Sequence, residues 1–140
     1  MDLFQRHDEP VLWPRNDVPW ASGAVFNPGA WYENEVVHMA FRAVPDGYNT
    51  IMVVEEGDEQ PRRGFVDYVS SIGYASSRDG VHFDWKPRPL IGPDSPADIY
   101  GAEDPRISKI GDVFLITYTA LSQPAFGGDR DGVRIGLAST

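Results

Sequence analysis

The stretch Gly101-Ala102-Glu103-Asp104-Pro105-Arg106 comes shortly before the apolar run Val113-Phe114-Leu115-Ile116-Thr117-Tyr118. Pro105 biases Asp104 away from helical backbone and toward an extended conformation. In an extended strand, residues 104 and 106 project to one face and residue 103 to the other. The spacing predicts that Asp104 and Arg106 point into one cavity, where the arginine biases the charge state of a candidate proton donor. Taken alone, the four residues 103–106 favour a simpler interpretation, a salt bridge where a strand begins.

The stretch 101–106 belongs to an internal repeat, which favours a functional role over a simple salt bridge. The matching pairs are Asn27-Pro28 with Asp104-Pro105 and residues 35–43 with 112–120, both at an offset of 77, and residues 72–77 with 135–140 at an offset of 63. The first copy is longer because it holds the charged segment 55–63, which we expect to be an exposed loop. Repeats of several short strands, each copy longer than a hairpin, are typical of propeller blades.

Runs of β-branched and aromatic residues, bounded by Gly, Pro, Asp and Asn, predict the strands. They cover residues 36–41, 51–54, 68–76, 113–118 and 133–138. Asp79-Gly80 predicts a turn that leads into an edge strand over residues 81–85. No segment has a sustained helical period. We therefore expect an almost entirely β structure of two adjacent four-stranded antiparallel blades, over residues 25–90 and 102–140, with the second blade incomplete.

Composition narrows the range of functions. The 140 residues are enough for one domain, and 41% of them are hydrophobic, so a core can form. A net charge of −9 argues against a nucleic acid or an anionic membrane as partner. Cysteine is absent, which excludes disulfides and thiolate chemistry, and the three histidines show no metal-ligand spacing. The N-terminus lacks an apolar signal core and no run spans a bilayer, so a cytoplasmic location is the simplest expectation.

The second copy of the repeat stops at Thr140, whereas the first continues into a turn, an edge strand and a proline-rich exit. Propellers typically need four or more blades to close, and two blades leave open sheet edges. We therefore expect the chain to be the N-terminal part of a longer propeller domain, inactive and prone to associate by itself.

Five motifs, in chain order, resemble glycoside hydrolase family 130, the β-mannoside phosphorylases and related β-mannosidases. The motifs are Val25-Phe26-Asn27-Pro28-Gly29-Ala30, Phe41-Arg42-Ala43, residues 72–83, residues 101–107 and Thr117-Tyr118-Thr119-Ala120. The resemblance runs from about Phe4 to Thr140. It implies an all-β fold, a five-bladed β-propeller of which this chain covers about the first two blades.

The resemblance also implies roles for individual residues. Asp104 matches the catalytic acid of the family, and Asn27 and Arg42 match positions that hold the sugar where the bond breaks. The implied reaction is inverting phosphorolysis of β-mannosidic bonds in manno-oligosaccharides, giving mannose 1-phosphate. Inorganic phosphate would be the co-substrate, with no other cofactor and no metal. One essential carboxylate suits this reaction, because phosphate replaces the base-activated water of an inverting glycosidase.

The repeat supports the same site independently. Equivalent positions of two blades face one central channel, so the side chains of Asn27 and Asp104 should converge. Arg42 lies late in an apolar strand, where a structural ion pair is the alternative to sugar binding. For Asn27 the alternative is a turn before proline. We expect Glu103 to point away from Asp104 and to make structural hydrogen bonds.

Weaker candidates complete the set. Arg106 and Tyr100 are candidates for bordering the sugar cleft, and Trp20, in a proline-rich segment, is a candidate for lining a distal subsite. Three alternatives to phosphorolysis stay open. They are β-mannoside hydrolysis within the same family, a hydrolase of another five-bladed propeller family, and a propeller that only binds sugar. Asn27 speaks against the second, which typically carries an early catalytic aspartate. Linkage is not readable, and a homo-oligomer stays open.

Overall fold

The computed structural model describes residues 4–54, 57, 59–124 and 132–140. Within this part, nine strands follow one 3-10 turn, η1 (Pro19–Ala21). The strands are β1 (Ala24–Glu33), β2 (Val36–Val44), β3 (Asn49–Val53), β4 (Arg62–Val66), β5 (Ser71–Ser77), β6 (Asp84–Trp85), β7 (Gly101–Ile110), β8 (Val113–Leu121) and β9 (Val133–Ser139). The predicted all-β fold is confirmed.

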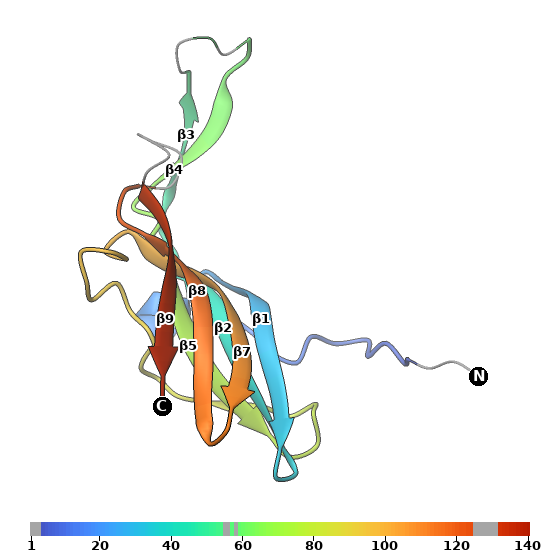
Figure 1. Ribbon diagram of the computed structural model, residues 1–140. Coiled ribbons are helices and arrows are strands. Elements are labelled where there is room, and N and C mark those ends of the chain that lie inside the picture. Colours follow the sequence, from blue (N-terminus) through green and yellow to red (C-terminus); the bar gives the residue numbers. More distant parts are fainter. Residues whose placement is uncertain (1–3, 55–56, 58, 125–131) are drawn as a thin grey trace.

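The strands form two larger sheets and a separate hairpin. The first sheet has the order β1-β2-β5-β6, the second has the order β7-β8-β9, and β3 pairs only with β4. All of these pairs are antiparallel. The β3–β4 hairpin leaves the first sheet between β2 and β5 and projects beyond both sheets (Figure 1).

The bounds of the strands reproduce the repeat. β1 and β7 begin and end 77 positions apart, and so do β2 and β8. In the first sheet, β2 lies between β1 and β5. In the second sheet, β8 lies in the same way between β7 and β9. The predicted equivalence of residues 35–43 and 112–120 is therefore confirmed.

Three predictions of strand positions need correction. The X-Pro pairs at 27–28 and 104–105 predicted the points where strands begin. Both pairs instead lie inside strands of ten residues, β1 and β7. Prolines are tolerated inside β1 and β7 because each lies at a bulge, where ladder hydrogen bonds are interrupted. Part of the expected loop 55–63 belongs to β4, and residues 55, 56 and 58 lie outside the described residues. β6 is only two residues long.

Two apolar layers cover the two faces of the first sheet. On one face, Ala40 and Ile72 pack against Ala102 and other residues of the second sheet. On the other face, the N-terminal segment packs on a layer that includes Phe41. Trp20 belongs to this layer, so its expected place at a distal subsite is not observed. Its ring stacks on that of Phe41 at 6.3 Å, and its Nε1 donates to the Pro87 carbonyl at 2.8 Å.

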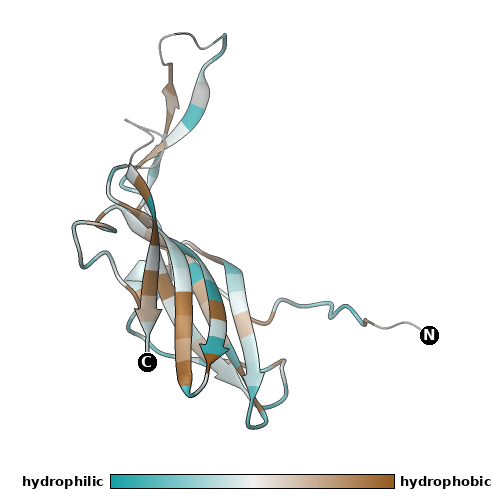
Figure 2. Cartoon of the chain, viewed as in Figure 1, coloured by the Kyte–Doolittle hydropathy of each residue, from teal (hydrophilic) through white to brown (hydrophobic). Residues whose placement is uncertain are grey.

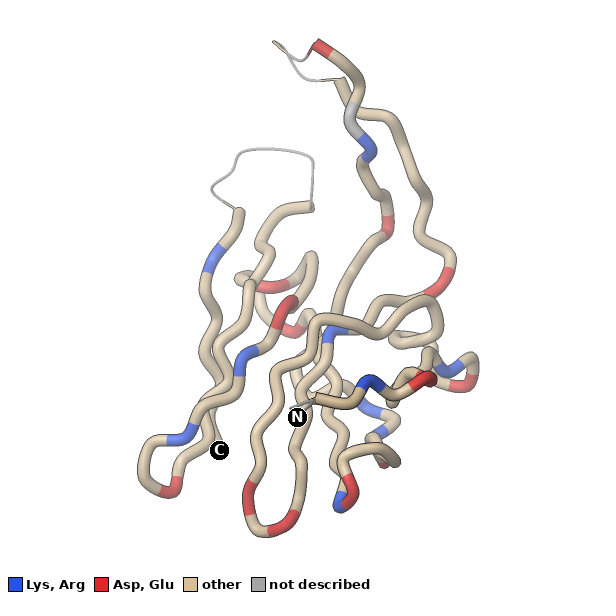
Figure 3. Tube along the Cα trace, turned by 90° about the vertical axis from the view of Figure 1, so that its right-hand side faces the viewer, with Lys and Arg blue, Asp and Glu red and all other residues tan. Residues whose placement is uncertain are grey.

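Hydrophobic residues also recur along β8 and β9 (Figure 2). One face of β9 is open, because its residues Val133, Ile135 and Leu137 are exposed. Ile135 in β9 is 87% exposed, whereas Ile72, its counterpart in the repeat, is completely buried. Charged residues of both signs are interspersed along the described chain (Figure 3). No helix among the described residues is long and apolar enough to cross a membrane.

Candidate active site

Asn27 and Asp104 occupy equivalent β-bulges. Each is the fourth residue of its strand, and the pairing register shifts between Phe26 and Gly29 in β1 and between Glu103 and Arg106 in β7. Both have left-handed backbone, with φ of 46° and 50°. Asparagine and aspartate are the side chains that accept this region most readily. The expected extended conformation of Asp104 is therefore wrong, because the extra residue of the bulge requires a local turn of the strand.

The two bulges lie against each other. Gly29 is buried, and a Cβ atom at this position would lie only 2.6 Å from the carbonyl oxygen of Pro105. The absence of a side chain at Gly29 thus lets β1 and β7 approach closely beside the two bulges. This approach is what brings residues from the two copies of the repeat to one place.

Asp104 is the centre of the cluster, and the expected convergence with Asn27 is observed. Asn27 Nδ2 donates to Asp104 Oδ1 at 2.9 Å, and Arg42 Nη1 donates to the same oxygen at 3.2 Å. The Asp104 side chain remains 38% exposed. Its second oxygen, Oδ2, accepts no hydrogen bond from the described residues. The carboxylate is therefore fixed at one oxygen and open at the other.

Glu103 lies in the same cluster, contrary to the prediction that it points away. Arg42 Nη2 donates to Glu103 Oε1, and Ser70 Oγ donates to the same oxygen at 2.9 Å. The bulge interrupts the alternation of faces, so neighbouring residues 103 and 104 both reach Arg42. Burial raises the pKa of Glu103, while the Arg42 guanidinium and the Ser70 hydroxyl act in the opposite direction.

Arg42 joins all parts of the cluster. Besides the two carboxylates it contacts Tyr68, whose hydroxyl oxygen accepts from Nη2 at 2.8 Å, and its guanidinium lies 4.8 Å from the centre of the Phe26 ring. Its side chain is only 12% exposed. The structural ion pair that was the alternative role for Arg42 is therefore formed, with Glu103. The same guanidinium also binds Asp104, the candidate acid.

The other candidates lie apart from this cluster. Arg106 is exposed, and its Nη1 donates to the carbonyl oxygen of Pro105 at 2.8 Å. The predicted shared face of Asp104 and Arg106 is not formed, because the register shift separates them. Tyr100 is exposed immediately before β7, and its backbone N–H donates to Leu121. Sequence reasoning missed Tyr68, which belongs to no motif.

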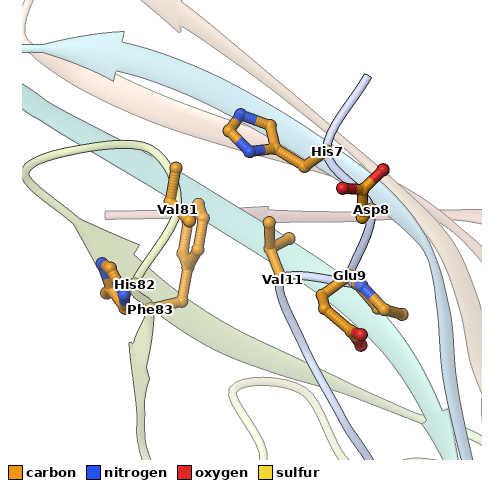
Figure 4. A pocket seen from close by; sticks show the side chains of 8 residues that line it. His7, Asp8, Glu9, Val11, Val81, His82 and Phe83 are labelled. Carbon is orange, nitrogen blue, oxygen red and sulfur yellow. The ribbon is translucent and has the colours of Figure 1, made fainter. Parts of the chain in front are cut away.

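A separate hollow of about 520 Å³ lies between the N-terminal segment and the turn before β6 (Figure 4). Its lining includes His7, Asp8 and His82 but none of the candidate residues. The His82 imidazole is already paired with Asp79 at 2.7 Å. Among the described residues, no group of three or more His, Cys, Asp or Glu side chains is placed to hold a metal ion.

Two equivalent antiparallel sheets thus bring an exposed carboxylate, an amide and a guanidinium together at one place. A sequence profile described as β-1,4-mannooligosaccharide phosphorylase of glycoside hydrolase family 130 matches residues 62–129. The chain belongs to this family, as the five motifs indicated.

Relatives of known activity agree with this assignment. The chain is 34% identical to a 1,2-β-oligomannan phosphorylase of Thermoanaerobacter sp. (strain X514), over 99% of this chain and 41% of the relative. It is also 34% identical to a β-1,2-mannobiose phosphorylase of the same organism, over 90% of this chain and 38% of that protein. The chain therefore spans about 40% of the length of the curated relatives that it matches.

A solved structure shows the same fold. The crystal structure of a glycosyl hydrolase from Bacteroides ovatus superposes with a TM-score of 0.68 at 26% sequence identity. The match covers 97% of this chain and 37% of that one. The arrangement of sheets described above is therefore shared with a solved glycoside-cleaving protein.

Proposed function

We propose that this chain supplies the acid side of an active site that cleaves β-mannosidic bonds by inverting phosphorolysis, releasing mannose 1-phosphate. The observation that carries the proposal is the Asp104 carboxyl group, which Asn27 and Arg42 hold at Oδ1 and which accepts no hydrogen bond at Oδ2 from the described residues. The two phosphorylases of Thermoanaerobacter support phosphorolysis, and both are named for β-1,2-linked substrates. We therefore propose the β-1,2 linkage, although the family description names β-1,4.

The geometry suits a proton donor. Oδ1 accepts two hydrogen bonds, so Oδ2 is the oxygen through which Asp104 would pass a proton in this mechanism. A phosphate oxygen attacks the anomeric carbon, the bond to the leaving oxygen breaks with its electron pair, and the proton of Asp104 reaches that oxygen. The family resemblance routes this proton through a hydroxyl of the mannosyl ring. Arg42 is already paired with two carboxylates, so it orients the acid and supplies no free charge for phosphate.

We further propose that residues 25–90 and 102–140 form two adjacent blades of a five-bladed propeller. The equal bounds of β1 and β7 support this proposal. So does the open face of β9, because Ile135 is 87% exposed where the equivalent Ile72 is covered by the next sheet. A third sheet packed on β9 would bury Ile135 in the same way.

Hydrolysis of β-mannosides is the second candidate, because the solved relative from Bacteroides ovatus is named a glycosyl hydrolase. It differs from phosphorolysis in the attacking group, which is a water molecule that a second carboxylate must activate as a base. The residues of the Asp104 cluster would serve both reactions equally well.

The test is to incubate the full-length protein that contains this chain with β-1,2- and β-1,4-mannobiose, with and without phosphate, and to measure mannose 1-phosphate and mannose. Phosphorolysis predicts mannose 1-phosphate only with phosphate, and release of mannose alone would select hydrolysis. Asp104→Asn should lower kcat by roughly 10²–10⁴-fold, and an aryl mannoside, whose leaving group hardly needs the proton, should suffer less.

Asp84→Asn, at an exposed position of β6, is the matched control and should leave kcat unchanged. If Asp104→Asn lost only affinity, then Asp104 would be a binding residue and the acid would have to be sought elsewhere. If the full-length protein turned over neither mannobiose, the proposed activity would be wrong.

A further inference from the structure

Tyr68 lies at the base of the projecting hairpin, between β4 and β5. The chain turns at Asp67, which has left-handed backbone with a φ of 61°. The ring of Tyr68 then packs among the aromatic rings of the hairpin base, 5.2 Å from Tyr48 and 5.2 Å from Phe65 between centroids. The hairpin base therefore holds this ring through Phe65 in β4 and Tyr48 just before β3.

The hydroxyl group of Tyr68 is fixed by Arg42. Its oxygen accepts from Arg42 Nη2 at 2.8 Å, and the guanidinium also lies 5.6 Å from the ring centroid. The same guanidinium binds Asp104 through Nη1. Because its nitrogens form a rigid fork, the Tyr68 hydroxyl and the Asp104 carboxylate are held close enough for one sugar unit to touch both.

The proton of this hydroxyl has no acceptor within the described residues. Arginine has only donors, so the bond to Arg42 occupies an oxygen lone pair and leaves the O–H free to donate. Burial raises the pKa of Tyr68, so the hydroxyl keeps its proton at neutral pH. A half-buried hydroxyl with a fixed oxygen and an unused proton, next to an open carboxylate, is arranged to bind a polar ligand.

We propose that Tyr68 is a substrate-binding residue that donates its hydroxyl proton to one hydroxyl group of the mannoside bound at Asp104. The inference rests on the proposed function, and it assigns to the β3–β4 hairpin the task of placing this donor. Arg42 then positions two groups that contact the sugar, the Asp104 carboxylate and the Tyr68 hydroxyl. Neither Tyr68 nor the hairpin belongs to the five motifs of the family.

The experiment is a calorimetric titration of the full-length wild-type protein and of its Tyr68→Phe variant with β-1,2-mannobiose and with its monodeoxy analogues. Tyr68→Phe keeps the ring and removes only the donor. It should weaken binding of β-1,2-mannobiose by about 3–10-fold, the value of one neutral hydrogen bond. For the one analogue that lacks the contacted hydroxyl, wild type and Tyr68→Phe should bind equally.

Tyr48→Phe is the matched control. Tyr48 lies in the same aromatic cluster, but its hydroxyl is not the one bound to Arg42, so its loss should leave the affinity unchanged. Thermal melts of both variants would verify that the hairpin base is intact.

Two results would overturn the inference while leaving the proposed function in place. One is an equal loss of affinity for every deoxy analogue, which would mean that Tyr68 acts only by packing or by orienting Arg42. The other is no loss for any ligand. If wild-type protein bound no mannobiose at all, the proposed function would fail first, and this inference would fail with it.

Discussion

Replacing Arg42 by methionine should lower the free energy of unfolding, because the buried carboxylate of Glu103 loses its charged partner. Methionine approximates the length of the side chain but removes the charge. Among the described residues, Glu103, which is 13% exposed, would keep only the Ser70 hydroxyl as a hydrogen-bond partner. Breaking a buried pair by removing one partner costs about 3–5 kcal/mol, because the remaining charge is uncompensated. Asp104 adds little to this figure, since its side chain is 38% exposed and solvent screens it.

The loss should depend on pH, with a sign that follows from the pKa of Glu103. Burial raises this pKa and Arg42 lowers it, so the variant should have a higher Glu103 pKa than the wild type. A carboxyl group whose pKa is raised on folding is stabilising below the unfolded value of about 4.3, and that stabilisation is lost as pH rises through the folded value. The deficit of Arg42→Met should therefore be small below the Glu103 pKa of the folded wild type and grow by about 1.4 kcal/mol per pH unit until pH reaches the higher Glu103 pKa of the variant.

Urea unfolding at several pH values would measure these quantities for wild type, Arg42→Met and the double variant Arg42→Met/Glu103→Gln. The double variant should recover most of the stability, because the unpaired charge is gone. Arg78→Met, at an exposed position in the turn after β5, is the control and should change stability by less than about 0.5 kcal/mol. A loss in Arg42→Met that is independent of pH, or a double variant no more stable than the single one, would refute the reasoning.

Gly29→Ala should lower the free energy of unfolding by about 1–3 kcal/mol, because its Cβ would lie 2.6 Å from the Pro105 carbonyl oxygen. An unchanged urea midpoint would show that β1 and β7 separate without cost. The pKa of His82 should lie above its ordinary value because Asp79 bonds its imidazole, and NMR titration of Asp79→Asn should bring it down. The ion pair of His82 and Asp79 should stabilise the fold below pH about 6.5, and this stabilisation should be lost as pH rises through the folded pKa of His82.

The amino-acid sequence by itself was sufficient for the strands that carry β-branched runs and for the repeat that relates the two sheets. The offset of 77 positions between Asn27 and Asp104 predicted that their side chains meet, and they do so at 2.9 Å. This succeeded because equivalent residues of a repeat take equivalent places in the fold. The family motifs, including Arg42, added the third member of the cluster.

Only the tertiary structure decided how the cluster is assembled. Alternation along an ideal strand placed Glu103 away from Asp104 and Arg106 beside it, and the bulge in β7 reversed both. Tyr68 reaches Arg42 from a hairpin that no local pattern connects with the site. Spacing rules describe a regular backbone within one segment. Bulges and contacts between distant segments depend on how β1 and β7 pack, which is determined by the whole molecule.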